Sequence, residues 1–176
     1  NEKLLLESGI KSEYVNIDNT SDYKNREQQE WEPDYGLSSH FIYKENINAL
    51  YFNSRIARYK FVLEAGLRIE NTNIKGQLPG NRLQADSSFS KSYINLFPSV
   101  TLSYQAGKNH TLNLSYRRRI DRPNYQDMNP FVYIFDTYTY EQGNTTLQPQ
   151  FSDNLELSYL LANNYKVAVF YNQTND

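Results

Sequence analysis

The sequence predicts an all-β protein, an antiparallel up-and-down meander of about seven long strands. Apolar and polar residues alternate with a period of two along much of the 176-residue chain, as in a strand with one apolar and one polar face. No long segment repeats apolar residues at the spacing of a helix. The composition agrees, because 16 Tyr favour strands and 21 Asn favour turns.

The alternation is clearest in residues 60–70, where Phe61, Leu63, Leu67 and Ile69 share one parity and charged residues occupy the other. The expected strands, in order, are 3–17, 41–56, 60–70, 92–105, 110–120, 154–161 and 165–171. The second strand fits less well, because Glu45 shares the parity of its apolar residues. In the fourth we expect a bulge or a local break at Pro98, since proline cannot donate to the ladder.

Long and short connections alternate along the chain. The long polar ones are 18–38, 75–90 and 121–149. The short ones are 57–59, 105–109 and 163–164. A meander then has every long loop at one rim and every short turn at the other, as in outer-membrane barrels. The alternative is a soluble β-sandwich module, with carbohydrate as one candidate ligand, because such a sheet also alternates.

Tyrosines near the expected strand ends would form the two aromatic girdles of a membrane barrel, where rings meet lipid headgroups. They are Tyr14, Tyr51, Tyr59, Tyr104, Tyr116, Tyr159 and Tyr165.

Charge, hydropathy and cysteine content exclude several classes of protein. The formal net charge is −2, which excludes a nucleic-acid binder that relies on a basic surface. The mean hydropathy is −0.76, and no apolar run approaches the roughly 20 residues of a membrane helix. Without cysteine, disulfide scaffolds and thiol chemistry are excluded. The opening Asn1-Glu2-Lys3-Leu4 already resembles a strand, so we expect a piece of a longer protein.

The most specific motifs lie in residues 111–151. Ser-Tyr-Arg-Arg-Arg-Ile-Asp-Arg-Pro occupies 115–123 and is followed by Asn-Pro-Phe at 129–131, Gly-Asn at 143–144 and Leu-Gln-Pro at 147–149. Upstream motifs at 43–51, 66–72 and 96–99 occur in the matching order. Together they resemble the barrel of TonB-dependent receptors of the Bacteroidetes type. Met128 stands where that family usually has Leu, and Thr145 where it prefers Pro.

This resemblance implies part of a large transmembrane β-barrel of about 22 strands. Residues 1–176 would be a partial barrel domain from its middle or C-terminal portion, with the plug domain and TonB box outside this chain. The implied location is the bacterial outer membrane, and the implied activity is binding and import of a scarce nutrient (siderophore, cobalamin or glycan). Implied partners are membrane lipid, the remaining barrel and plug, TonB, and a small-molecule or glycan ligand, but no nucleic acid.

Arginines at the end of the fifth expected strand are the first candidate ligand-binding residues, because guanidinium groups match carboxylates and phosphates. They are Arg117, Arg119 and Arg122. The alternative is a structural junction in which Arg117 and Arg119 face a polar lumen and pair with acidic residues. The available carboxylates are Asp121, Glu156 and Glu70. Arg118 has the opposite parity, so we expect it to face outward near the level of the lipid headgroups.

Aromatic residues of the long connections form the second candidate set. Tyr133, Tyr138 and Tyr140 could stack on a sugar or siderophore, with Phe131 and Phe135 on the same side as Tyr133. The alternative is that this segment extends the strands above the bilayer and packs on itself. Trp31, in the first long connection, is a further candidate ligand contact.

No sequence pattern indicates catalysis. The nucleophile motif Gly-x-Ser-x-Gly is absent, no calcium-loop spacing occurs, and His40 and His110 are the only histidines. We therefore expect no enzyme activity, no cofactor and no metal site.

Overall fold

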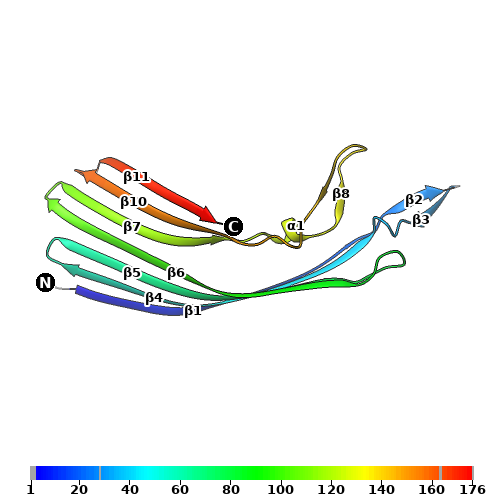
Figure 1. The fold of residues 1–176 in the computed structure, drawn as a ribbon, viewed down its shortest axis with the longest axis horizontal. Coiled ribbons are helices and arrows are strands. Elements are labelled where there is room, and N and C mark those ends of the chain that lie inside the picture. The colour runs from blue at the N-terminus through cyan, green and yellow to red at the C-terminus, as the bar shows by residue number, and fades with distance from the viewer. Residues whose placement is uncertain (1–2, 28, 163, 176) are drawn as a thin grey trace.

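The computed structural model describes residues 3–27, 29–162 and 164–175, and its main element is a seven-stranded antiparallel sheet. The strands pair in chain order, so the predicted meander is confirmed. They are β1 (Lys3–Ser21), β4 (Ser39–Arg58), β5 (Phe61–Leu78), β6 (Ser87–Gly107), β7 (His110–Asp121), β10 (Gln150–Leu161) and β11 (Tyr165–Asn175). Figure 1 shows them as one long, curved layer.

The long connections lie at one rim of the sheet and the short turns at the other, as predicted (Figure 1). The first long connection contains the hairpin β2 (Lys24–Glu27) and β3 (Glu30–Pro33). The third contains helix α1 (Tyr125–Met128) and the hairpin β8 (Val132–Ile134) and β9 (Tyr140–Gln142). Of the turn predicted at 163–164, residue 163 lies outside the described residues. No helix within the described residues is long and apolar enough to cross a membrane.

One face of the sheet, which we call the outer face, is apolar. Leu63 pairs with Leu102, Leu102 with Leu114, and Leu114 with Leu157, so a leucine row crosses four strands. Eight apolar side chains of this face are all exposed: Phe61, Leu63, Leu67, Ile69, Leu112, Leu114, Leu155 and Leu157. A β-sandwich would bury them against a second sheet, so the sandwich alternative is not supported.

The apolar face of the second long strand, β4, differs from the prediction. The even residues Leu50, Phe52 and Ile56 point to the outer face, because they pair with Ile69, Leu67 and Leu63 of β5. The odd residues, including Phe41, Tyr43 and Glu45, lie on the opposite, inner face. The alternation was ambiguous there because β4 carries apolar residues on both faces.

The strands extend beyond their predicted ends, and four of the seven are much longer than the other three. β1, β4, β5 and β6 have 19, 20, 18 and 21 residues, whereas β7, β10 and β11 have 12, 12 and 11. About 10 residues suffice to cross the membrane, so the first four continue well past it at the rim of long connections.

The break predicted at Pro98 occurs on one side of β6 only. The β5–β6 register runs unbroken through the pair Leu67–Pro98, and the irregularity of β6 lies instead between Gln105 and Gly107. Pro98 is one residue beyond the last β6–β7 pair, Ser99–Arg117. On that side the ladder stops at Pro98 although β7 continues to Asp121, as expected for a residue that cannot donate to a ladder.

Among the tyrosines expected in girdles, Tyr51 is an exception. It pairs with Gly9 across β1 and β4 and lies on the inner face. A Cβ atom at Gly9 would be 2.3 Å from the Tyr51 hydroxyl, so the glycine makes room for the ring. Tyr104, Tyr116 and Tyr159 occupy the outer face, in line with the prediction.

A small hydrophobic core lies on the inner face, near the rim of long connections. It joins Phe41, Tyr43 and Ile74 of the sheet to two residues of the third connection, Met128 and Phe131. The ring centroids of Phe41 and Tyr125 are 5.8 Å apart in a stacked arrangement. This packing holds the third connection against the inner face, on the concave side of the sheet (Figure 1).

Candidate ligand-binding site

The third connection, which we call loop 122–149, begins at an ion-pair cluster on the inner face. Glu70 of β5 is buried, and its Oε2 accepts hydrogen bonds from Arg68 at 2.6 and 2.7 Å. Its Oε1 is in ion-pair contact with the Arg122 guanidinium. The first residue after β7 is thereby tied to a strand two positions away in the sheet.

Helix α1 and its flanks give loop 122–149 a defined shape. Asn124 and Asp127 form a reciprocal capping box, in which each side chain accepts the backbone N–H of the other residue. The buried Asn129 donates to the Tyr133 hydroxyl at 2.7 Å, and its carbonyl accepts from Gly143 N at 3.0 Å. A Cβ atom at Gly143 would be 2.4 Å from that carbonyl. The Asn-Pro-Phe and Gly-Asn motifs therefore form one structural unit.

Arg117 and Arg119 lie on the inner face of β7, next to the start of this loop. Neither makes an ion pair within the described residues. The predicted structural pairing of these two residues is therefore wrong, because Glu70 binds Arg68 and Arg122 while Glu156 binds Lys166 at 2.6 Å. Both guanidinium groups are available to a ligand or a partner.

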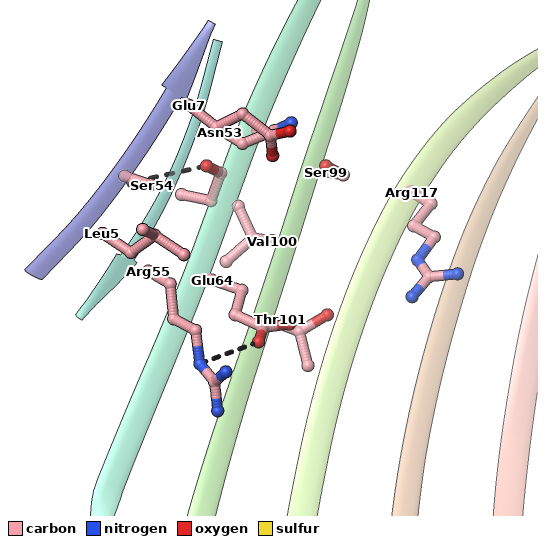
Figure 2. Close-up of a pocket in the computed structure, with 12 residues that line it drawn as sticks. Leu5, Glu7, Asn53, Ser54, Arg55, Glu64, Ser99, Val100, Thr101 and Arg117 are labelled. Carbon is pink, nitrogen blue, oxygen red and sulfur yellow. Dashed lines mark hydrogen bonds and ion pairs between the residues drawn. The ribbon is translucent and has the colours of Figure 1, made fainter. Parts of the chain in front are cut away.

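Two hollows on the inner face adjoin these arginines. The first, of about 440 Å³, extends from β1 to β7 and includes Glu7, Asn53, Glu64 and Arg117. Figure 2 shows Arg55 and Glu64 joined across it, at 3.2 Å, while Arg117 stands apart on its own strand. The second, of about 220 Å³, is lined by residues that include Arg117, Arg119, Glu156, Phe170 and Asn172. Arg117 borders both hollows, so it lies at the centre of the polar wall.

The aromatic candidates are not brought together in one platform. Tyr133 pairs with Glu141 and Tyr140 with Ile134, so the two tyrosines project from opposite faces of the β8–β9 hairpin. Tyr138 lies at the hairpin tip and is 95% exposed. Trp31 is exposed on the other hairpin, with the Arg26 guanidinium 6.0 Å from its ring centroid.

The expected common side of Phe131, Tyr133 and Phe135 is also not observed. Phe131 is buried in the core, whereas Phe135 is 67% exposed. The strand pattern assumed for this segment fails because Phe131 belongs to the turn before β8 and packs on the sheet. The self-packing alternative holds only in part, because Phe131 contacts Phe41 of the sheet as well as Tyr133 of its own segment.

A third hollow, between the first two long connections, was not anticipated from the sequence. It has a volume of about 410 Å³ and is lined by residues that include Tyr23, Tyr35, His40 and Asn81. The Asn81 amide donates to the carbonyls of Tyr35 and Ser38 at 2.9 and 3.0 Å, which joins the two connections. Asparagine is common throughout this chain, so no sequence signal singled out Asn81.

The chemistry of the inner wall is that of a binding surface. Guanidinium groups, amides and carboxylates line the hollows, and they can recognise anionic and hydroxyl-rich groups. Within the described residues, no three His, Asp or Glu side chains are grouped so as to hold a metal ion.

Comparisons with known proteins agree with this architecture. No curated protein matches the chain. Among solved structures, the crystal structure of the siderophore receptor PiuA from Acinetobacter baumannii is similar, with a TM-score of 0.53 and 14% sequence identity. The similarity covers 80% of this chain and 20% of the receptor, so the chain spans about a fifth of that protein. At 14% identity, this similarity is evidence for a shared fold alone.

The family model that matches is that of the outer membrane protein beta-barrel family, and it covers residues 1–176. The match agrees with the apolar outer face, the polar inner face and the separation of long and short connections. The chain belongs to the outer membrane protein beta-barrel family and is located in the bacterial outer membrane.

Proposed function

We propose that this chain is part of the barrel wall of a TonB-dependent receptor of the Bacteroidetes type. The receptor imports a scarce nutrient of the siderophore, cobalamin or glycan class and is not an enzyme. The rest of the barrel, the plug domain and the TonB box belong to the same protein outside residues 1–176. Binding occurs from the external side, and TonB supplies the energy that moves the plug.

The anchored position of loop 122–149 is the observation that carries this proposal. A loop that only connected two strands would extend into solvent, whereas this one packs Met128 and Phe131 onto the inner face and pairs Arg122 with Glu70. An inward loop narrows the lumen of a barrel at its external mouth. A ligand that enters then passes the polar wall of β7.

The candidate residues take different roles in this function. Arg117 and Arg119 bind anionic or hydroxyl-rich groups of the ligand at the wall, since their guanidinium groups have no ion-pair partner within the described residues. The exposed rings of Trp31, Tyr138 and Tyr140, on the two hairpins of the long connections, make the first contacts with the ligand. Arg122 and Tyr133 support the loop, because their polar groups are already bound to Glu70 and Asn129.

Ligand binding and uptake by the intact receptor test the proposal. Purified receptor in detergent is titrated calorimetrically with a ferric siderophore panel, cobalamin and a glycan panel. Uptake of any ligand that binds is then measured in cells with and without TonB. We expect one class to bind and its uptake to require TonB. Absence of binding in all three classes, or uptake that is independent of TonB, would overturn the proposal.

A double variant tests the role of the wall arginines separately. Arg117→Gln/Arg119→Gln should weaken the binding of an anionic ligand about tenfold or more, as expected for lost charge-assisted hydrogen bonds. Arg82→Gln is the matched control, because Arg82 lies in the second long connection and contacts Tyr35. If the double variant and the control bind the ligand equally well, Arg117 and Arg119 are not part of the binding site. That result would not contradict the proposed transport function.

A further inference from the structure

Arg118 faces away from its two arginine neighbours. It pairs with Asp153 of β10. This pair lies two residues along the strands from Tyr116–Leu155, and therefore on the same outer face. The outward residues of β7 are thus Leu112, Leu114, Tyr116, Arg118 and Ile120, in the direction of loop 122–149. On β10 the matching outward sequence is Tyr159, Leu157, Leu155, Asp153 and Phe151.

The apolar band of the outer face is interrupted at the row of Arg118 and Asp153. Tyr116 and Leu155 precede this row, Gln173 of β11 continues it, and the apolar pair Ile120–Phe151 lies one row closer to the rim of long connections. The long connections mark this rim as the external one. Arg118 lies three residues from Asp121, the end of β7 at this rim, and about 10 residues suffice to cross the membrane. We therefore place it at the headgroup level of the outer leaflet, where an outward arginine is tolerated.

The guanidinium of Arg118 is oriented but has no ion-pair partner within the described residues. Its Cζ lies 5.2 Å from the ring centroid of Phe151, a cation–π contact that limits its motion. Asp153, the carboxylate directly opposite, instead accepts a hydrogen bond from the Tyr116 hydroxyl at 2.7 Å. Arg118 is exposed on the outer face.

We propose that Arg118, held by Phe151 and flanked by Tyr116, binds a phosphate group of an outer-leaflet lipid. A guanidinium fork matches two phosphate oxygens in a bidentate contact, which a neutral headgroup does not offer. The arginine thereby fixes the height and rotation of β7 in the membrane, next to the strand end where loop 122–149 begins. This inference rests on the outer-membrane location and is independent of the transported ligand.

Lipid retention by the intact receptor tests this site. Receptor in non-ionic detergent is loaded with diphosphoryl lipid A, and bound lipid is counted by native mass spectrometry. We expect Arg118→Gln to lower retention about tenfold and Arg119→Gln, one residue away on the inner face, to leave it unchanged. The same lipid without phosphates should be retained no better by the unsubstituted receptor than by Arg118→Gln.

For a second variant we expect lipid retention to change in the opposite direction. Misfolding would lower retention, so it cannot explain an increase. Asp153→Asn removes a carboxylate next to the phosphate and should increase lipid retention. Equal retention by the unsubstituted receptor, Arg118→Gln and Asp153→Asn would overturn the proposal. Complete displacement of the lipid by inorganic phosphate would assign the site to free phosphate and would also overturn it.

Discussion

Glu70 places one buried carboxylate between two guanidinium groups. A lone carboxylate would lose several kcal/mol of hydration on burial, and Arg68 from its own strand compensates with hydrogen bonds of 2.6 and 2.7 Å. The second compensating charge, Arg122, comes from the loop. The ion-pair cluster therefore joins the barrel wall to loop 122–149, and its energy depends on the loop being in place.

Glu70→Gln should release loop 122–149 from the wall. The two arginines would lose their charged partner, and because they are 35% and 22% exposed we expect a cost of about 2 kcal/mol, below that of a fully buried pair. Hydrogen–deuterium exchange of the amides of 125–131 should accelerate about thirtyfold. Glu64→Gln, which breaks a half-exposed pair with Arg55, is the control. Equal acceleration in both variants would contradict the anchoring role.

Asp34 makes the first long connection sensitive to acid. Hydrogen bonds from the Leu37 N–H, the Asn25 amide and the Gly36 N–H, at 3.1, 2.7 and 2.9 Å, favour the carboxylate. They hold its pKa below the ordinary value of 3.8. The folded pKa is lowered, so the stabilisation is fully present above about pH 4 and is lost as pH falls through the lowered pKa.

The amide resonances of Gly36 and Leu37 should therefore titrate together with a midpoint below 3.8. Nuclear magnetic resonance of the selectively labelled protein in detergent follows both signals. In Asp34→Asn the same signals should not titrate in this range, because no ionisable group remains at the turn. A midpoint above 3.8 would show that these hydrogen bonds do not favour the carboxylate.

At the scale of elements, α1 shows how a four-residue helix persists. A helix this short has little intrinsic stability, yet the capping box of Asn124 and Asp127 satisfies two of its free N–H groups. Its far end is held by Asn129 and by the burial of Met128. The helix is therefore stable as part of loop 122–149, with the sheet as its support.

Asn124→Ala should destabilise α1 by about 1 kcal/mol, the usual effect of losing an N-cap side chain. The Asp127 amide, which donates to Asn124 Oδ1 at 3.0 Å, should exchange about fivefold faster. Gln126→Ala is the matched control, since this exposed residue lies on the same helix. Unchanged exchange in Asn124→Ala would mean that packing alone holds the helix.

Period-two alternation predicted the outer face well and the inner face poorly. The outer face meets a uniform apolar environment, so Leu63, Leu102, Leu114 and Leu157 follow a simple rule. The inner face meets solvent near the short turns and loop 122–149 near the other rim, so β4 carries both Glu45 and the buried Phe41. The alternation of apolar and polar residues cannot distinguish an inner face that is covered by a loop from an outer face that contacts lipid.

For the candidate site, the sequence predicted only which face of a strand a side chain occupies. The parity of Arg117 and Arg119 placed them correctly on the inner face. The partner of Arg122 was not predictable, because Glu70 is far away in sequence and approaches only through the sheet register. The separation of Tyr133 from Tyr140 depends on a three-residue strand, which is too short for alternation to reveal.

For the whole molecule, a mean hydropathy of −0.76 is compatible with membrane insertion because averages hide the distribution of residues over two faces. Every second strand residue belongs to the polar inner face, and the long connections add more polar residues. Exposed leucines, valines and aromatics cover the outer face instead of a core. The free energy of burial is gained from lipid, so a change in one side chain should matter according to its face.

Leu114 and Asn113 offer a direct comparison of the two faces. They are adjacent on β7, and Leu114 lies in the leucine row of the outer face while Asn113 faces inward. Leu114→Arg should cost about 2–4 kcal/mol near the middle of the bilayer, whereas Asn113→Arg should insert normally into the polar lumen. The measurement is the fraction folded in vesicles, from the heat-modifiable electrophoretic mobility of the protein. Equal loss of folding in both variants would contradict the assignment of the two faces, and with it the membrane-spanning role of the sheet.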